Sequence, residues 1–387
     1  MSTRSWLFVL ALLGCTEKNP HYNGNGDGGG GTDSTSGTDA GSSQHDAGIA
    51  CTQTCAGVTP VCDGTTGTCR ACVKNSECDA DVCLANGSCA TASQVAYVTG
   101  SGGSDAACTK AAPCATIAYT ITRAPYVRLL TSMTETVNIG SGTTELVGDT
   151  GITLGPTNGG DTIVTVHGVA TSPIVTISQL ELTGTGSNGA YVTNGTLGFD
   201  RARVDGAGAF GVYATNASVT MDRTYIESNT GGGLYAFSTP FTIRNSVIAG
   251  NGSLTGLYGG VFNASNSQSS VQFSTIVQNM GAATNNGNGI ACSSGETLAN
   301  DIIYANTPTN NGVQTNCSYT YSDVQGGTNG GTNINGDPML NSDFSLMADS
   351  PAINAASPTS SDPYDILGTP RPQGSGSDMG AFEYKQP

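Results

Sequence analysis

The chain has 387 residues, of which 55 are glycine and only 11% are charged, and its formal net charge is −16. So few charged residues exclude a fold built mainly from amphipathic helices, and they favour many short strands joined by tight turns. An acidic chain also lacks the broad basic surface that neutralises phosphates, which excludes nucleic acid as a partner.

The N-terminus has the features of an export signal. The apolar run Trp6–Leu13 has the length of a signal peptide and is too short to span a bilayer. It ends in Leu-Leu-Gly-Cys at residues 12–15, which resembles the bacterial lipobox. The resemblance implies that residues 1–15 are a lipoprotein signal, and that Cys15 is lipidated on sulfur and becomes the new N-terminus. The alternative is an ordinary secretory signal with a chance cysteine.

A lipidated Cys15 makes the membrane a partner through a durable acyl anchor. Thr16, rather than aspartate, follows this cysteine, so inner-membrane retention is not indicated. We therefore expect the protein to be exported and lipid-anchored, in the outer membrane or at the cell surface of a Gram-negative bacterium. Residues 16–50 are almost entirely polar and small, which predicts a disordered Gly/Ser/Thr/Asp tether.

Residues 51–90 are a cysteine-rich module that is too small to fold on a hydrophobic core, so disulfides must stabilise it. A zinc site is the rival interpretation, but only Cys69 and Cys72 have metal-type spacing and the module contains no histidine. With Cys15 set aside, an even number of cysteines remains, which an oxidising compartment would allow to pair. They are Cys51, Cys55, Cys62, Cys69, Cys72, Cys78, Cys83, Cys89, Cys108, Cys114, Cys292 and Cys317. The pairing within the module stays open.

Residues 91–387 are predicted to form one domain with an N-terminal cap and a C-terminal closing segment. Tyr97-Val98 is a short strand, the Gly-rich stretch after it is a turn, and ATIAYTITRA at 115–124 is a short helix. The phrase PCATI at 113–117 resembles the N-terminal cap of secreted β-helix proteins.

Internal periodicity indicates the fold of this domain. One apolar position recurs at intervals of 22, 22, 22, 28, 27 and 21 residues: Leu182, Val204, Ile226, Ile248, Ile276, Ile303 and Val324. A second strand opens at Gly189, Gly211, Gly233, Gly260, Gly289 and Gly312. A third carries Val175/Ile177, Leu197/Phe199, Val219/Met221, Phe241/Ile243, Val271 and Leu298.

Three short strands in a repeat of about 22 residues are what each coil of a parallel β-helix needs. The fold class is therefore all-β, a right-handed parallel β-helix that forms a single-stranded solenoid behind the disulfide-rich module. A leucine-rich repeat would need a helix or extended arc in each repeat, and no such segment is present. By alternation, Ile226 should point into the core and Tyr225 outward, where we expect an aspartate at position 225 to be tolerated.

Two further features fit this register. Asn229, Asn251, Asn279 and Asn306 follow the aligned position by three residues, so their amides should stack in a ladder at one turn. Cys292 and Cys317 fall near the same strand of adjacent coils, which predicts a disulfide between them.

The C-terminal segment contains SPAIN at 350–354, followed by Arg371-Pro372 and by SDMGAFEY at 377–384. This pattern resembles the closing segment of choice-of-anchor Q domains, a large class of bacterial secreted β-helix proteins within the pectate-lyase-like superfamily. The resemblance implies fold and secretion but specifies no reaction. For Arg371, Asp378 and Glu383 we favour a hydrogen-bonded cap that shields the last coil.

One charged cluster is the weak candidate for a catalytic or binding site. Asp200, Arg201, Asp222, Arg223 and Arg244 should stack at the same bend of three consecutive coils. They could form a subsite for an acidic sugar, with the aspartates acting as base or as Ca²⁺ ligands and the arginines neutralising a carboxylate. Ca²⁺ is the one cofactor considered, and no other metal or cofactor is expected. A surface ion-pair ladder explains the same residues, and we favour it.

Three functions remain open. The first is a tethered surface module that binds polysaccharide or has a structural role. The second is a polysaccharide lyase or glycoside hydrolase acting on acidic polysaccharide, and the third is an adhesin or cell-contact scaffold. An enzyme is the less favoured class, because the polygalacturonase motifs are absent and His167 stands alone. Coil lengths vary on one side of the later coils, where SLTGLYG at 253–259 and MGAATNNGN at 280–288 project and could carry binding residues.

Overall fold

The computed structural model describes residues 51–385 except 52, 101–106, 185, 257, 265–267, 283–287, 294–295, 308–316, 328–330 and 361. The signal with Cys15, the tether at 16–50, most of the Gly-rich turn after Val98, much of MGAATNNGN and Gly312 lie outside the described residues. Among the residues described, no helix has the length and apolar character needed to cross a membrane.

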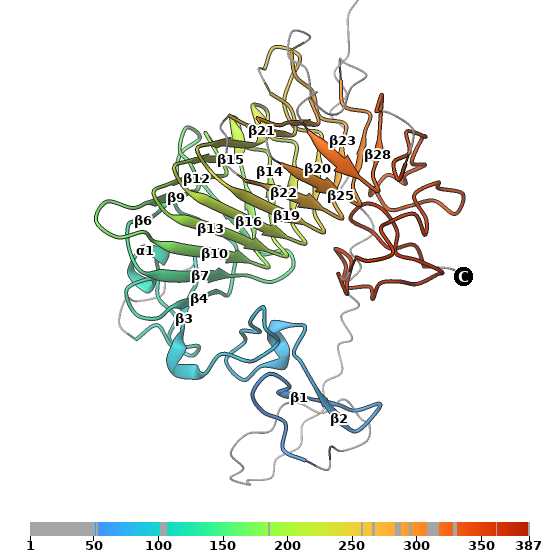
Figure 1. The fold of residues 1–387 in the computed structure, drawn as a ribbon. Coiled ribbons are helices and arrows are strands. Elements are labelled where there is room, and N and C mark those ends of the chain that lie inside the picture. The colour runs from blue at the N-terminus through green and yellow to red at the C-terminus, as the bar shows by residue number, and fades with distance from the viewer. Residues whose placement is uncertain are drawn as a thin grey trace, which may run out of the picture. The chain divides into compact units, whose positions relative to one another are not determined.

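The strands of the domain stack into three parallel sheets, which we name A, B and C in the order in which each coil passes through them (Figure 1). Sheet A consists of β3 (Val95–Val98), β4 (Tyr126–Leu129), β7 (Thr143–Val147), β10 (Ile174–Ser178), β13 (Thr196–Asp200), β16 (Ser218–Asp222), β19 (Phe241–Arg244), β22 (Ser270–Gln272), β25 (Thr297–Ala299) and β27 (Ser318–Thr320). Sheet B consists of β5 (Met133–Thr134), β8 (Thr153–Gly155), β11 (Glu181–Thr183), β14 (Arg203–Asp205), β17 (Tyr225–Glu227), β20 (Val247–Ala249), β23 (Thr275–Val277), β26 (Ile302–Tyr304) and β28 (Asp323–Val324). Sheet C consists of β6 (Val137–Ile139), β9 (Val164–His167), β12 (Ala190–Thr193), β15 (Phe210–Thr215), β18 (Gly232–Phe237), β21 (Val261–Asn263) and β24 (Ile290–Ala291).

The predicted parallel β-helix is confirmed, and so is its register. In sheet B, Ile226 pairs with Val204 on one side and Ile248 on the other, and the series continues to Val324 as the periodicity predicts. The inward residues of all three sheets meet in one continuous apolar core, in which Ile226 is fully buried. Each coil is therefore held by its neighbours through backbone pairing outside and apolar contact inside.

Side-chain ladders stabilise the turns between sheets B and C. The Nδ2 atom of Asn229 donates to Oδ1 of Asn251 at 2.8 Å. In the same way Asn251 donates to Asn279 at 3.0 Å, and Asn279 donates to Asn306 at 2.9 Å. Each Oδ1 also accepts from the backbone N–H of the preceding ladder residue. Gly260 lies beside this ladder, directly before β21. Only glycine fits there, because a Cβ would lie 2.3 Å from the carbonyl oxygen of Gly289. The predicted asparagine ladder is thus present and buried.

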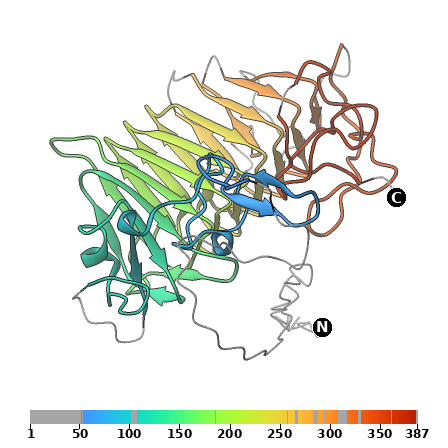
Figure 2. The same ribbon diagram turned by 90° about the horizontal axis from the view of Figure 1, so that it is seen from below.

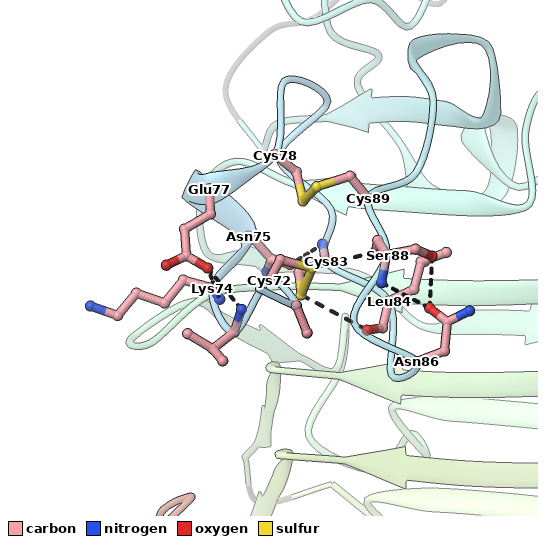
Figure 3. Close-up of a disulfide and its surroundings, with 12 residues drawn as sticks. Cys72, Lys74, Asn75, Glu77, Cys78, Cys83, Leu84, Asn86, Ser88 and Cys89 are labelled. Atoms are coloured by element: carbon pink, nitrogen blue, oxygen red, sulfur yellow. Dashed lines mark hydrogen bonds between the residues drawn. A yellow bond between two sulfur atoms is a disulfide. The ribbon is translucent and has the colours of Figure 1, made fainter. Parts of the chain in front are cut away.

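The cysteine-rich module contains the antiparallel pair β1 (Val61–Asp63) and β2 (Thr68–Arg70) and the short 3-10 helix η1 (Asn75–Glu77). Its cysteines form disulfides rather than a zinc site, and two of these flank η1 (Figure 3). The disulfides of the described chain are Cys51–Cys62, Cys55–Cys69, Cys72–Cys83, Cys78–Cys89, Cys108–Cys114 and Cys292–Cys317. The last of them is the predicted bridge between adjacent coils.

The module is fixed to the β-helix by a buried amide and a small apolar cluster. Asn75 is fully buried, and its Nδ2 donates to the carbonyl oxygen of Gly148 at 2.8 Å while its Oδ1 accepts from the backbone N–H of Cys83. Val82 of the module shares a buried cluster with Tyr97 and Val147 of the first coils. Figure 2 shows the module beside the stacked coils. The module is therefore packed against the coils rather than joined to them by a free linker.

The entry to the β-helix is short and cross-linked. The 3-10 helix η2 (Ala92–Gln94) leads into β3, and the predicted helix near 115–124 is the single turn α1 (Ile117–Thr120). Thr116 caps α1 by accepting from the backbone N–H of Tyr119, and Glu135 accepts from the N–H groups of Ile117 and Ala118. Both carboxylate oxygens of Glu135 are therefore used to hold the start of α1.

The closing segment covers the outer face of the later strands of sheet B, a contact that the sequence did not predict. Leu346, Ala352, Ile366, Met379 and Phe382 form a second apolar core with outward residues of the later sheet B strands. Those strand residues are Tyr225, Val247, Ala249, Val277, Ile302 and Tyr304. The closing segment thus buries a lateral apolar face that alternation alone would leave exposed to water.

Two expectations change as a result. Tyr225 points outward as predicted, but it packs against the closing segment, and Arg203 lies 5.8 Å from its ring centre, so an aspartate there should not be tolerated. Arg371, Asp378 and Glu383 do form a hydrogen-bonded cluster. Arg371 donates to Oε2 of Glu383 at 2.9 Å, and Asp378 accepts from the N–H groups of Asn354 and Tyr384. The cluster braces the closing segment from within.

Candidate functional site

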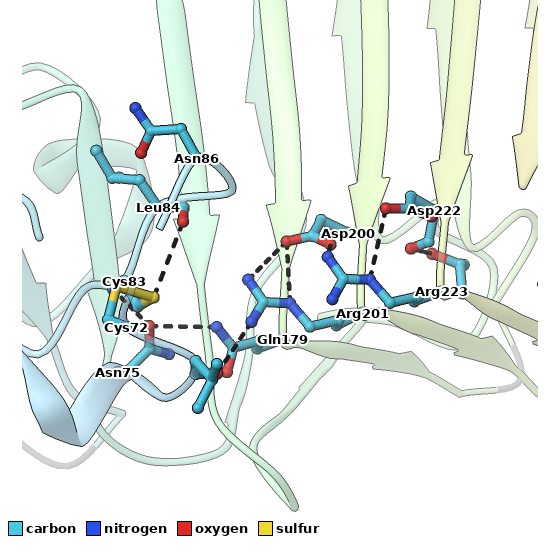
Figure 4. A network of polar contacts seen from close by, with 12 residues as sticks. Cys72, Asn75, Cys83, Leu84, Asn86, Gln179, Asp200, Arg201, Asp222 and Arg223 are labelled. Carbon is cyan, nitrogen blue, oxygen red and sulfur yellow. Dashed lines mark hydrogen bonds and ion pairs between the residues drawn. A yellow bond between two sulfur atoms is a disulfide. The ribbon is translucent and has the colours of Figure 1, made fainter. Parts of the chain in front are cut away.

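The charged residues predicted from the sequence do lie together at one bend, where they form a continuous row of ion pairs (Figure 4). Asp200 pairs with Asp222, and Asp222 with Arg244, in neighbouring strands of sheet A. Arg201 and Arg223 each adopt a left-handed backbone conformation just after the strand, at φ 51° and 49°. That conformation turns the chain from sheet A into sheet B and brings both guanidinium groups back over the aspartates.

Charges of opposite sign alternate along this ladder. Asp200 accepts from Arg201 at 2.7 Å and from Arg223 at 3.1 Å. Asp222 in turn lies 3.4 Å from both Arg223 and Arg244. Both carboxylates are therefore already neutralised by arginine, which leaves them poorly placed to hold Ca²⁺ or to act as a base.

The two ends of the ladder contact other parts of the chain. Arg201 donates to the carbonyl oxygen of Val73 in the cysteine-rich module at 3.1 Å. At the other end, Arg244 lies 3.7 Å from Asp362 of the closing segment, which also accepts from Asn245. These contacts favour a structural role in which the ladder positions the module and the closing segment.

Replacing Arg223 with alanine should test that role. The substitution leaves Asp200 paired with Arg201 and Asp222 paired with Arg244, so we expect a loss of only about 1 kcal/mol in the free energy of unfolding. Urea unfolding followed by circular dichroism measures it. A loss of polysaccharide binding with unchanged stability would instead show that the ladder is a ligand subsite.

A second group of charges lies on sheet B, around Arg203. This arginine contacts Glu227 at 2.5 Å and lies 3.7 Å from Asp205, while Thr183 donates to Asp205 at 2.8 Å. Burial raises the pKa of Glu227, although Arg203 opposes the shift; burial also raises the pKa of Glu181, with the negative charge of Asp205 adding to it. Sequence reasoning did not single out this group, because its members are spread over β11, β14 and β17.

The acidic groups whose pKa values are raised most lie in the last coils and in the closing segment. Asp323 in the last coil is fully buried, and neither of its carboxylate oxygens has a hydrogen-bond partner in the described chain. Burial raises its pKa to about 7, with the charge of Asp337 adding to the shift. Burial likewise raises the pKa of Asp378 to about 6 and that of Asp301 well above its usual range. Asp378 belongs to the closing segment itself, whereas Asp301 accepts from the backbone N–H of Ser274 within the coils.

The raised pKa of Asp323 predicts a pH-dependent stability. Between roughly pH 4 and 7 the unfolded carboxyl loses its proton while the folded one keeps it, so stability should fall as pH rises and then level off. Asp323→Asn should remove roughly 3 kcal/mol of that fall. Thermal unfolding across this pH range measures the effect, with the exposed Asp349→Asn as the control. Equal pH profiles for wild type and Asp323→Asn would contradict the assignment.

A shallow open groove of about 860 Å³ lies beside α1. Its lining includes Thr116, Ser132, Thr134, Glu135 and Thr183. The one carboxylate of this lining is Glu135, which already accepts from the cap of α1. The groove thus presents hydroxyl groups, and its carboxylate is already hydrogen-bonded to the backbone of α1.

The outer face of sheet C differs from all of these. Tyr191, Tyr213, Tyr235 and Phe262 occupy the same outward register position in four successive coils, and we call them the aromatic row. Neighbouring ring centres are 5.6, 4.8 and 5.3 Å apart, and the rings of Tyr213 and Tyr235 are stacked within 9°. The four rings are half-buried, so each keeps part of its surface in water.

Two further rings flank the aromatic row. Phe210, at the start of β15, lies 5.7 Å from Tyr213 and 5.3 Å from Tyr235. Tyr258 stacks on Phe262 with the ring centres 3.7 Å apart. Tyr258 belongs to the insertion SLTGLYG, so the lengthened coil that the sequence marked as a binding loop does bring a side chain to this face.

The aromatic row contains the hydroxyls of Tyr191, Tyr213 and Tyr235, and Tyr258 adds one beside it. No hydrogen bond within the described residues engages the hydroxyls of Tyr191, Tyr213, Tyr235 or Tyr258. Burial raises the pKa of Tyr213 and Tyr235, and the neighbouring tyrosines add to it, so both hydroxyls stay protonated and can donate. Tyr213 and Tyr235 stack on each other, and because both are outward residues of sheet C, their exposed parts lie on its outer face. This face can therefore offer apolar and hydrogen-bonding contacts side by side.

Sheet geometry and register define a right-handed parallel β-helix. Residues 162–329 match the family model described as the right handed beta helix region. Among solved structures, the chain is similar to the crystal structure of pectate lyase Pel9A, with 17% sequence identity and a TM-score of 0.40, over 75% of this chain and 96% of that chain. No curated protein matches the sequence. The resemblance of the closing segment to choice-of-anchor Q domains stays a prediction.

Proposed function

We propose that this chain is an exported, lipid-anchored surface module that binds a polysaccharide through the aromatic row of sheet C. The observation that carries the proposal is the row itself, which places four half-buried rings along one line of the β-helix. Tyrosine supplies a rigid apolar surface and a hydroxyl at little entropic cost, which suits a ligand with both apolar and hydroxyl-bearing faces. Sugars have this character.

The way the chain is built supports a rigid display of this face. Asn75 and the buried cluster around Val82 fix the cysteine-rich module to the first coils, and the closing segment covers sheet B in the later coils. The predicted tether at 16–50 would hold this body away from the membrane while Cys15 anchors it. An anchored rigid rod with one aromatic face is suited to holding a long polymer.

Binding is tested by retention of the purified full-length chain on a panel of neutral and acidic polysaccharides, with the products analysed beside it. We expect retention without shortened chains. Unsaturated sugars, detected by ultraviolet absorbance, would show β-elimination, and new reducing ends alone would show hydrolysis. Either product would support the alternative function, a lyase or glycoside hydrolase that acts on polysaccharide. Failure to retain any polymer would contradict the proposed function.

The anchor is tested separately. Cys15→Ser removes the thiol that lipidation requires, so the protein should lose lipid labelling and leave the membrane fraction for the soluble one. Metabolic labelling with a fatty acid and membrane fractionation measure both effects. Cys15-independent labelling and retention would contradict the lipoprotein assignment and leave the aromatic row unaffected.

A further inference from the structure

Charges are distributed unevenly over the three faces of the β-helix. The strands of sheet C contain no aspartate, glutamate, lysine or arginine; all of them are described. Sheet A strands carry Arg128, Glu145, Asp200, Asp222 and Arg244, and sheet B strands carry Glu181, Arg203, Asp205, Glu227 and Asp323. The face that bears the aromatic row is thus the uncharged side of a chain whose net charge is −16.

The side chains around the aromatic row are hydroxyl and amide groups, with one imidazole and one phenylalanine ring among them. Thr165 and Asn138 continue the register of the row toward the N-terminal coils. A parallel outward line runs through His167, Thr193, Thr215 and Phe237, of which Phe237 is 45% exposed. A carboxylated or sulfated polymer would meet no lysine or arginine on the described strands of this face and would be repelled by the net charge of the protein. A hydroxyl-rich polymer would meet hydroxyls and ring edges along its whole length.

From this distribution we infer that the ligand of the aromatic row is an uncharged polysaccharide that lies along the helix axis, from Tyr191 toward Tyr258. The inference rests on the proposed function and adds the ligand class and its direction. Successive coils repeat about every 4.8 Å, which is close to the rise per sugar of an extended pyranose chain. One ring of the row can therefore meet each successive sugar. The flanking ring of Tyr258 extends the contact at the far end.

The test measures affinity for soluble neutral and acidic polysaccharides by affinity electrophoresis of the full-length chain, at salt from about 0.05 to 0.5 M. We expect a neutral polymer to bind with an affinity that salt leaves unchanged. Tyr235→Ala should weaken that binding about tenfold, because it removes the central ring of the row. Tyr213→Phe should weaken it less, since only a hydroxyl is lost. The matched control is Tyr364→Ala in the closing segment, where the tyrosine is 49% exposed and should not matter.

Each other outcome overturns a defined part of the inference. Binding of acidic polymers alone, with an affinity that falls as salt rises, would overturn the ligand class while leaving the proposed function standing. Neutral binding that survives both Tyr235→Ala and Tyr258→Ala would overturn the location. A dimer that Tyr235→Ala dissociates would mean that a second copy of the chain occupies the face. Circular dichroism of each variant confirms that the β-helix is folded.

Discussion

Replacing Ile226 with aspartate is expected to prevent the β-helix from folding. Ile226 is fully buried between Val204 and Ile248 in the continuous core. A carboxylate there would have no partner, and its desolvation costs several kcal/mol, which is comparable with the whole stability of a domain. Urea unfolding followed by circular dichroism measures the loss.

The control must be an outward position that no other segment covers. Thr220 meets this requirement, because it is exposed in the middle of β16. Thr220→Asp should change stability by no more than about 0.5 kcal/mol. Tyr225→Asp should be damaging, because Tyr225 packs under the closing segment. Equal stability of Ile226→Asp and Thr220→Asp would refute the register.

Replacing Arg371 with alanine is expected to cost about 3–5 kcal/mol, because it leaves the carboxylate of Glu383 buried without its counter-charge. Both side chains are fully buried, and Arg371 also donates to the carbonyl oxygens of Asp378 and Gly380. Its guanidinium lies 4.6 Å from the ring centre of Phe273. The substitution should therefore loosen the closing segment from sheet B. Thermal unfolding and the rate of limited proteolysis near residue 371 measure this.

Arg123→Ala provides the comparison, because Arg123 is exposed and contacts only Tyr119 among described side chains. It should change stability by less than about 1 kcal/mol. A closing segment that resists proteolysis equally in Arg371→Ala and Arg123→Ala would contradict a bracing role for the buried pair.

The coils could be predicted from the sequence because each depends on local information. An apolar residue near every twenty-second position must face a shared interior, so Leu182, Val204 and Ile226 fall into register without knowledge of distant contacts. The bridge between Cys292 and Cys317 follows from the same register. The pairing within the module does not, because its eight closely spaced cysteines have no repeat to order them.

The cover on sheet B could not be predicted in this way. It depends on a contact between Tyr225 and a segment more than a hundred residues later, and alternation says only that Tyr225 points outward. The charged ladder was placed correctly, but its closure by Val73 and Asp362 required the three-dimensional arrangement.

The aromatic row was visible in the sequence and was overlooked. Tyr191, Tyr213 and Tyr235 stand 22 residues apart, immediately beside apolar positions that defined the strand. Their repeat is a second signal beside the one that defines the core, because outward residues of stacked strands recur at the same interval as inward ones.

A crystal structure of the protein with a bound neutral oligosaccharide would show directly which face holds the ligand. We expect sugar rings along the outer face of sheet C, over Tyr213 and Tyr235, with their chain parallel to the helix axis. Sugar bound instead at the arginine–aspartate ladder of Asp200 and Arg223, or in the groove beside Glu135, would contradict it.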